Sequence, residues 1–431
     1  MLTIPELIGL DSQHGTIRIP PEFGVPLTGR VRRIIDTEPF RRLAKITQVG
    51  LVSLIYPGAR HTRFEHSLGV YRLALLLFKR LSHVPEFTSR VSQRDAERFI
   101  VTALLHDVGH YPFCHLIEDI KIDGLPHHEK LAAEFIEQSE LAELLRTDWN
   151  LEPQEVINLL NGKTETAVDH LLASMLSGPI DIDKMDYLYR DSLHAGVPYG
   201  RQLDQDRLIG SLCLNASGNG LAITEKGKTA TELMIFARYV MFTEVYWHHA
   251  VRSATAMLQR LFSELYLVGK VEFSQYVQFS EDEAIRFFLD ASQGTPMEKL
   301  AQGLFGVRRT IYKRVAQFSI LEHPEAYHLL AGKPYRQLCE QADQYGASAT
   351  APHLSVLLDA PPVEKEVEIK IDVYYPKLDR YLALEDISPA VRAMAKEQFD
   401  DYAKHVRIFA HPDIAPSLRF PAVTFFTESD V

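Results

Sequence analysis

The feature that most constrains the fold of this sequence is the stretch His106–His115, which reads HDVGHYPFCH and follows the apolar-rich run Ala96–Leu105. The run has the pattern of a buried helix, so a His-Asp pair and two further histidines lie at its end, beside a packed core. A single buried histidine is usually a core residue with a hydrogen-bond partner. Four polar, metal-competent side chains together need partners or a metal ion to offset their desolvation. The fold must therefore bring further ligands to this point from elsewhere in the chain.

Composition limits the classes of protein to which the chain can belong. Its 431 residues, 46% apolar and 24% charged, are typical of a globular protein with a large core. The formal net charge of −11 argues against extended binding to the phosphate backbone of nucleic acid. The three widely spaced cysteines form no disulfide framework and suit a reducing cytosol. Because neither a signal-peptide pattern nor a run of membrane-spanning length occurs, we expect a cytoplasmic protein that does not associate with membranes.

Helical periodicity dominates the first 270 residues. Apolar residues at helical spacing from Val70 to Leu81 predict a helix with His66 in its first turn, and Asp95–Asp107 predicts the next helix. Gly15–Ile19 suggests a small hairpin, and Ser217–Gly220 is typical of a β-hairpin turn. Further helices are expected over residues 128–145, 153–160, 166–176, 183–191 and 228–267. We therefore predict a mainly α fold, with a helical core over residues 1–270 that includes an N-terminal arm of about 30 residues.

The sequence pattern changes beyond about Lys270. Alternating apolar and charged residues predict a half-exposed strand at Glu366–Tyr374. His405–Phe409 and Ala422–Phe426 are also strand-like. These segments predict a smaller, mixed α/β region over residues 271–431, packed on the helical core and suited to oligomerisation or regulation.

Imidazole and carboxylate ligands for the His-Asp pair are available far from it in the sequence. Metal sites of this kind form when helix packing brings scattered side chains together. His66 offers an imidazole, and Asp183 is the best candidate for a distant carboxylate. Asp181 lies only two residues earlier, so both carboxylates cannot face the same way on a helix, and Asp181 can equally cap that helix after Pro179. The candidate ligands are therefore His66, His106, Asp107 and Asp183.

These stretches resemble the HD-domain phosphohydrolases, whose pattern is a distant His, an adjacent His-Asp and a distant Asp. More narrowly, the chain is similar to the deoxynucleoside triphosphate triphosphohydrolase branch. The resemblance extends from about Leu10 to Leu267 and is specific because several motifs occur in the right order. They are Tyr56–Ala59, Arg63–Val70, His106–His115 and Asp181–Asp191.

The resemblance implies that the four candidate ligands hold one divalent metal ion. Imidazole and carboxylate ligands do not distinguish manganese, iron, magnesium, zinc and nickel. A second magnesium ion can accompany the substrate phosphates. His110, His115 and His128 are the available proton donors near this metal, because imidazole titrates near neutral pH. By resemblance, His115 and His128 contact phosphates and His115 is the favoured acid, while Glu118 either orients His115 or is simply a solvated surface residue.

The resemblance also implies a set of nucleotide contacts. Arg63 precedes His66 by three residues, and its guanidinium is suited to clamp a phosphate. Phe242 stands where the family has a base-contacting histidine, which puts base preference in doubt. Asp191 matches a family residue that reads the sugar 3′-hydroxyl. The other contacts implied are Gln48, Lys184, Tyr187, Arg238 and Tyr246.

The sequence departs from the regulated members of this branch. Asp36 of their effector site is kept, but Arg41 and Ala44 replace a Gln and an Arg. The segment Arg308–Lys313 resembles one that reaches an effector nucleotide at a subunit interface, although a solvated basic segment explains it equally well. The resemblance favours a homo-oligomer, either a dimer or a tetramer.

Three functions are compatible with these residues. The first is metal-dependent hydrolysis of a deoxynucleoside triphosphate to a deoxynucleoside and inorganic triphosphate. The second keeps the metal site but acts on another nucleotide, as an HD-type nucleotidase or phosphodiesterase. The third is a nucleotide-binding regulatory protein with little turnover, against which the complete set of metal ligands argues.

Overall fold

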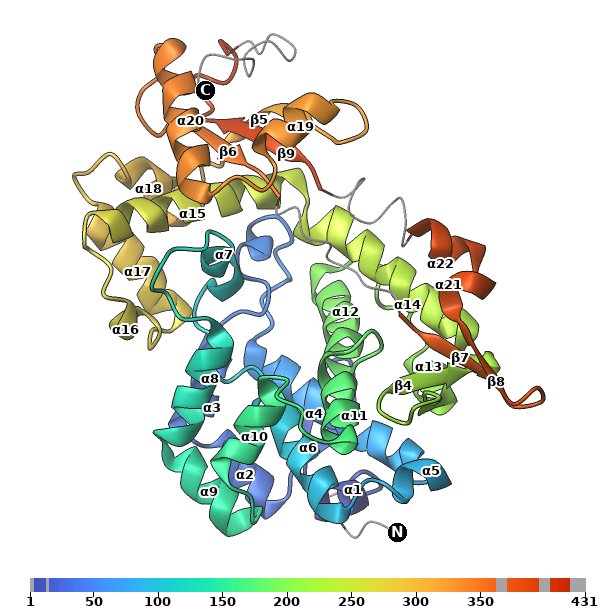
Figure 1. Ribbon diagram of the computed structural model, residues 1–431. Coiled ribbons are helices and arrows are strands. Elements are labelled where there is room, and N and C mark those ends of the chain that lie inside the picture. Colours follow the sequence, from blue (N-terminus) through green and yellow to red (C-terminus); the bar gives the residue numbers. More distant parts are fainter. Residues whose placement is uncertain (1–3, 13–14, 362–369, 395–403, 419–431) are drawn as a thin grey trace.

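The predicted fold class is confirmed by the computed structural model, which describes residues 4–12, 15–361, 370–394 and 404–418. Within these ranges the protein is mainly helical, and its small sheets lie at the N-terminus and toward the C-terminal third (Figure 1). No helix in the described ranges is long and apolar enough to span a membrane.

Three packed helices form the centre of the N-terminal half. They are α4 (Arg63–Leu81), α6 (Gln93–Leu105) and α12 (Ile182–Ala195). Each begins where a side chain accepts a hydrogen bond from a backbone N–H of the first turn: Thr62, Ser92 and Asp181 are the capping residues. Helix α4 is buried along most of its length and packs against both α6 and α12, so residues from three distant segments meet in one core.

Shorter helices surround this centre (Figure 1). The expected helix over 128–145 is wrong as a single element: α8 (His128–Glu137) ends, and Ser139 caps a new helix, α9 (Glu140–Asp148). The serine hydroxyl accepts from the backbone N–H of Leu141, which stabilises the break. The other short helices and 3₁₀ turns of this half are α1 (Pro5–Gly9), α2 (Gly29–Ile35), α3 (Glu38–Arg42), η1 (Leu43–Lys45), η2 (Gly50–Leu54), α5 (Pro85–Thr88), α7 (Cys114–Glu118), α10 (Pro153–Leu160), α11 (Ala167–Ser177) and α13 (Gln205–Ser211).

The long helix expected over 228–267 is interrupted. Helix α14 (Lys228–Met241) runs into a π-helical turn, η4 (Phe242–Tyr246), and a new helix, α15 (His249–Leu267), follows. In the π turn the backbone N–H of Trp247 donates to the carbonyl of Phe242 at 2.8 Å, an i→i+5 bond. The chain leaves the helical conformation at His248, whose side chain accepts from the N–H of Ala250 and so restarts the helix. π turns of this kind are frequent at functional sites.

Two of the sheets involve residues from far apart in the sequence. The first has the strand order β3 (Leu212–Leu214), β4 (Leu221–Thr224), β7 (Asp372–Tyr375) and β8 (Arg380–Ala383). A short 3₁₀ turn, η3 (Glu225–Gly227), directly follows β4 in the sequence. The second is antiparallel and has the order β5 (Lys313–Phe318), β9 (Val406–Ala410) and β6 (Val356–Asp359). At the N-terminus, β1 (Thr16–Ile19) and β2 (Phe23–Pro26) form the expected hairpin.

The expected strands of the C-terminal third are confirmed where the structure describes them. Strand β7 corresponds to the end of the segment 366–374, and β9 to 405–409, whereas the expected strand 422–426 lies outside the described residues. The parallel pairing of β4 with β7 places strands from both sides of residue 270 in one sheet. The division of the chain at about residue 270 stays a prediction.

The second sheet lies over α15 together with two helices of the C-terminal third (Figure 1). These are α19 (Pro324–Leu330) and α20 (Tyr335–Ser348). The remaining helices are α16 (Phe273–Tyr276), α17 (Glu281–Ser292), α18 (Glu298–Phe305), α21 (Leu384–Ile387) and α22 (Pro389–Ala393).

Candidate functional site

The four predicted metal ligands converge on one point between α4, α6 and α12. His66 Nε2 lies 3.0 Å from Asp183 Oδ1 and 3.2 Å from His106 Nε2. Asp107 Oδ1 lies 3.5 Å from His106 Nε2, and its Oδ2 lies 4.0 Å from His66 Nε2. Donor atoms bound to one ion at about 2.1 Å are separated by about 3 Å. The ligand atoms of His66, His106 and Asp183 all lie within 4.8 Å of one another and suit a coordination sphere, and Asp107 lies at its edge.

The histidine tautomers support a cation at this point. His66 Nδ1 lies 2.8 Å from Asp186 Oδ2, and His106 Nδ1 lies 2.9 Å from the carbonyl oxygen of Ala103. Both partners are acceptors, so each Nδ1 carries a proton and each Nε2 is left to face the carboxylates. A metal ion can take the place of the Nε2 protons at this point, because two imidazole Nε2 atoms and the carboxylates of Asp107 and Asp183 face one another.

The electrostatics of the site also favour positive charge. Burial alone would lower the pKa of His66, but hydrogen bonds with Asp183 and Asp186 raise it to about 10. Burial opposes ionisation of Asp107, yet His110 and Arg63 hold its pKa well below the usual range. The residues present thus fit a divalent metal held by imidazole and carboxylate, and the donor set does not choose among the metals named above.

A second group of histidines lies beside the metal ligands: His110 precedes α7, His115 is on α7 and His128 begins α8. His110 Nε2 lies 3.1 Å from His115 Nε2, and the His110 and His128 rings contact each other at a tilt of 33° with centroids 4.1 Å apart. The glycine of the HDVGH motif permits this approach, because a Cβ at Gly109 would lie 2.1 Å from the carbonyl oxygen of His128. All three predicted proton donors are therefore neighbours.

Glu118 joins this group rather than facing solvent as a surface residue. Its carboxylate accepts from the backbone N–H of His128 at 2.6 Å and lies 2.9 Å from His128 Nδ1. It is 3.7 Å from His115 Nδ1. Burial would raise the pKa of Glu118, but hydrogen bonds with His115 and His128 hold it well below its usual range. The carboxylate thus stays ionised and orients His128 more closely than His115.

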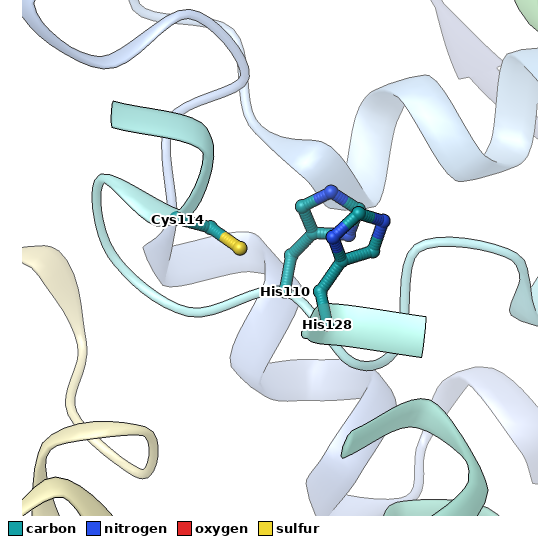
Figure 2. Close-up of side chains that lie close together, drawn as sticks. All are labelled: His110, Cys114 and His128. Atoms are coloured by element: carbon teal, nitrogen blue, oxygen red, sulfur yellow. The ribbon is translucent and has the colours of Figure 1, made fainter. Parts of the chain in front are cut away.

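Cys114 packs against the same histidines, as Figure 2 shows for Cys114, His110 and His128. Ligand atoms of these three residues lie within 4.8 Å of one another. Burial raises the pKa of the Cys114 thiol far above its usual value, so the group is a neutral thiol. Burial and the positive charge of Arg63 also lower the pKa of His110 well below its usual value. His110 and Cys114 are therefore uncharged, and we assign Cys114 no chemical role.

Arg63 occupies the boundary between the metal ligands and the open space of the site. Its Nη1 donates to Asp107 Oδ2 at 2.8 Å, and its Nη2 donates to the carbonyl oxygen of Gln48 at 3.5 Å. Arg63 also lines a cavity of about 1470 Å³. A phosphate entering this cavity would meet a guanidinium that is already held in place by a metal ligand.

The cavity collects some of the predicted nucleotide contacts but not all. Its lining includes Gln48, Arg63, His115, Glu118, Tyr187, Asp191 and Tyr246, together with Phe242 and Trp247 of the π turn and its end. Lys184 does not line it, because its ammonium is paired with Asp181 Oδ2 at 2.5 Å. Arg238 is also outside the lining but lies near Tyr187: burial raises the pKa of the Tyr187 phenol, and the charge of Arg238 opposes this rise.

Several residues of the site escaped the sequence reasoning. Asp186 accepts from His66 Nδ1 and forms a bidentate pair with Arg190, whose Nε and Nη2 lie 2.8 and 2.7 Å from its carboxylate oxygens. Glu65 bonds the same arginine at 2.7 Å, and His61 bonds Asp191 at 2.8 Å. The i, i+4 spacing of Asp186 and Arg190 on a helix was a readable signal for the first pair. No local pattern connects His61 with Asp191.

Asp181 is the capping residue that the sequence allowed as an alternative to a metal ligand. Its carboxylate accepts from the backbone N–H of Lys184 at 2.7 Å, and burial raises its pKa to about 7. Asp183, two residues later, turns toward His66 instead. The two carboxylates thus face different ways, as expected.

Two protein families match the chain, and the metal ligands lie within the first match. Residues 63–191 match the HD domain, and residues 203–427 match the HD associated region, which by itself covers more than half of the chain. The chain therefore belongs to the HD-domain phosphohydrolase superfamily.

Individual relatives range from uncharacterised proteins to named enzymes. An uncharacterised protein of Methanocaldococcus jannaschii is 34% identical over 291 residues, which are 67% of this chain and 56% of that protein. The uncharacterised protein YwfO of Bacillus subtilis is 34% identical over 230 residues, 53% of this chain and 50% of that protein. The deoxynucleoside triphosphate triphosphohydrolase SAMHD1 of Gallus gallus is 30% identical over 297 residues, 62% of this chain and 46% of that protein. The chain thus spans about half the length of these curated relatives.

A solved structure shares the fold over nearly the whole chain. A hypothetical protein from Aquifex aeolicus superposes with a TM-score of 0.72 at 26% sequence identity, covering 93% of this chain and 98% of that one. The arrangement of the HD domain and the region after it is therefore common to both proteins.

Proposed function

We propose that the protein hydrolyses deoxynucleoside triphosphates to a deoxynucleoside and inorganic triphosphate. The observation that carries this proposal is the position of Arg63, which bonds the metal ligand Asp107 and lines the same cavity as the candidate acid His115. Relatives named deoxynucleoside triphosphate triphosphohydrolase from Gallus gallus, Mus musculus and Dictyostelium discoideum support the choice of substrate. The volume of the cavity, about 1470 Å³, exceeds what a nucleotide-sized ligand needs.

His66, His106, Asp107 and Asp183 would hold the divalent metal. When bound, the metal would activate a water molecule and neutralise charge on the phosphates. Arg63 then contributes fixed positive charge at the edge of the metal ligands, where the phosphates have to lie.

The histidine group handles the proton of the leaving oxygen. His115 is more than half exposed and lines the cavity, so it can reach the 5′-oxygen of the nucleoside, whereas His110 behind it is buried. His110 Nε2, at 3.1 Å, can exchange a proton with His115 Nε2. Glu118 lies 3.7 Å from His115 Nδ1 and holds His128 beside the phosphates. The nucleoside lies against Gln48, Tyr187, Asp191 and Tyr246, with Lys184 and Arg238 reaching it only after a rearrangement.

The assembly and cellular place of the protein complete the proposal. We expect a homo-oligomer in the cytoplasm, a dimer or tetramer, that takes a nucleotide and does not bind nucleic acid. The C-terminal region would serve oligomerisation or regulation. A second magnesium ion would accompany the substrate phosphates.

Product analysis of the purified protein tests the proposed reaction. The protein is incubated with each dNTP and NTP and with simpler phosphoesters, with the metal varied, and all products are separated by ion-exchange chromatography. Intact triphosphate and a deoxynucleoside are expected, and His115→Gln should reduce their formation without changing metal content. Release of orthophosphate or pyrophosphate, or turnover of monoesters or cyclic nucleotides only, would instead show a nucleotidase or phosphodiesterase. Tight nucleotide binding by metal-replete protein without any product would show a regulatory protein.

A further inference from the structure

The carboxylate of Asp191 is held at both oxygens before any ligand arrives. His61 Nε2 lies 2.8 Å from its Oδ1, and the hydroxyl of Tyr246 donates to its Oδ2 at 2.5 Å. The Asp191 side chain is buried, although the residue contributes to the wall of the cavity. An ionised carboxylate has about four acceptor positions, so two remain for a ligand hydroxyl once its direction is fixed.

Among the described residues, the His61 ring has one hydrogen-bond partner, the carboxylate of Asp191. Its ring is fully buried, and its Nδ1 finds no hydrogen-bond partner among the residues that the structure describes. A carboxylate only accepts, so His61 Nε2 carries the proton and donates it to Asp191. Burying Nδ1 without a hydrogen-bond partner destabilises the folded protein, so His61 is not placed here for its own hydrogen bonding at both nitrogens.

A continuous chain of side chains connects His61 with the metal ligands. The His61 ring stacks on the His194 ring with centroids 4.5 Å apart, and His194 Nε2 lies 2.9 Å from Glu65 Oε1. Glu65 accepts from Arg190 at 2.7 Å. Arg190 pairs with Asp186, and Asp186 accepts from His66. The orientations of the metal ligand His66 and of the sugar-side carboxylate Asp191 are thus set by one network.

Two glycines show how tightly this network is packed. A Cβ at Gly69 would lie 1.9 Å from Asp186 Oδ1 and 2.3 Å from Arg190 Nη2. Gly58 precedes His61 by three residues, and a Cβ at Gly58 would lie 2.5 Å from the carbonyl oxygen of His194. The backbone therefore approaches the network closely at both glycines and leaves no room for a side chain there.

We infer that His61 is a positioning residue that fixes the Asp191 carboxylate for recognition of the sugar 3′-hydroxyl. This inference rests on the proposed function, in which Asp191 faces the deoxyribose. His61 touches neither phosphate nor metal in this arrangement. Its loss should therefore change discrimination at the sugar, while the metal remains bound.

Kinetics with two substrates test the inference. The ratio of kcat/KM for a dNTP to that for its 2′,3′-dideoxy analogue is measured for the wild type, His61→Gln and His61→Leu. We expect the wild type to favour the dNTP by about tenfold to a hundredfold, the value of one hydrogen bond to a charged acceptor. In His61→Leu the ratio should fall to about threefold or less, whereas His61→Gln, whose amide nitrogen reaches the Nε2 position, should retain most of it. Metal content by elemental analysis should be equal in all three proteins.

Matched variants separate positioning from a structural role. His170→Leu removes an exposed histidine from α11 and should leave the ratio unchanged. If His61→Leu does not fold, His61→Asn replaces it, because its shorter amide stays polar but does not reach Asp191. An equal loss of activity toward both substrates, or an unchanged ratio in the variant that lacks the donor, overturns the inference.

Crystal structures of the metal-loaded variants keep the two proposals apart. A wild-type protein that hydrolyses no dNTP refutes the proposed function only. In that case the Asp191 side chain should still rotate away from Tyr246 in His61→Leu, or in His61→Asn if that variant replaces it. The same side chain should stay in place in His61→Gln. An Asp191 side chain that is unmoved in both variants refutes the positioning role of His61.

Discussion

Replacement of Asp186 by asparagine tests how the metal ligands are held. Asp186 accepts from His66 Nδ1 at 2.8 Å and thereby fixes the tautomer in which Nε2 can bind a metal. Asparagine has nearly the same volume, but its amide has only one acceptor oxygen where the carboxylate meets three donor nitrogens. Arg190 or His66 must lose a hydrogen bond, and where the amide oxygen keeps His66 it is a neutral acceptor that holds the imidazole less strongly than a carboxylate does. We therefore expect both metal affinity and stability to fall.

The structure allows both losses to be estimated. Removing a partner that orients a metal-binding histidine typically lowers metal affinity about 10- to 100-fold, or about 1.4 to 2.8 kcal/mol. Removing one partner of a buried ion pair typically costs about 3 to 5 kcal/mol. Arg190 is 1% exposed but keeps Glu65 at 2.7 Å, so we expect the lower end, about 3 kcal/mol.

Competition with a chelator measures the metal affinity, and thermal unfolding of metal-free protein measures stability. Asp169→Asn is the control, because Asp169 of α11 forms a less buried pair with Arg98 of α6 at 2.7 Å, apart from the metal ligands. It should lose stability but no metal affinity. Wild-type metal affinity in Asp186→Asn, within about twofold, would refute the view that this carboxylate orients His66.

Three further perturbations follow from the same geometry. His106→Ala and Asp107→Ala should each abolish metal binding and turnover together, measured by elemental analysis and product release, and full activity in either would contradict the ligand assignment. Gly69→Ala should lower the melting temperature and the metal content, because its methyl group would displace the Asp186–Arg190 pair. Gly210→Ala in α13, where a Cβ meets open space, should lower neither the melting temperature nor the metal content. Native Cys114 should resist iodoacetamide at pH 8 because burial raises its thiol pKa, and mass spectrometry should detect its alkylation only after unfolding; rapid labelling of the native protein would show that the thiol is accessible.

The sequence was sufficient for the features that depend on local pattern. Helical periodicity placed α4, α6 and α12, and the order of the motifs on them predicted that His66, His106 and Asp183 would meet. The cap before α12 was also readable, since Asp181 follows Pro179 and precedes an apolar-periodic run.

Other features depended on contacts that no local pattern encodes. The π turn at Phe242–Tyr246 has the same residue types as an α-helix, and only the packing of the two flanking helices determines where the extra residue is accommodated. The contact of His61 with Asp191 spans 130 positions and arises because the loop before α4 folds against the C-terminal end of α12. The pairing of Arg63 with Asp107 likewise required the three-dimensional distance between two motifs that had been assigned separate roles.

The π turn has a consequence for the direction of the cavity wall. Its hydrogen bond spans one residue more than that of an α-helical turn, so each residue advances less around the helix axis. If the same residues formed an ordinary α-helix, each would advance by about 100°, and Tyr246 would point in another direction and leave Asp191. No side chain that contacts the cavity would have been substituted, yet the aromatic wall and the sugar-side carboxylate would separate. In this segment the winding of the helix is itself a determinant of the site.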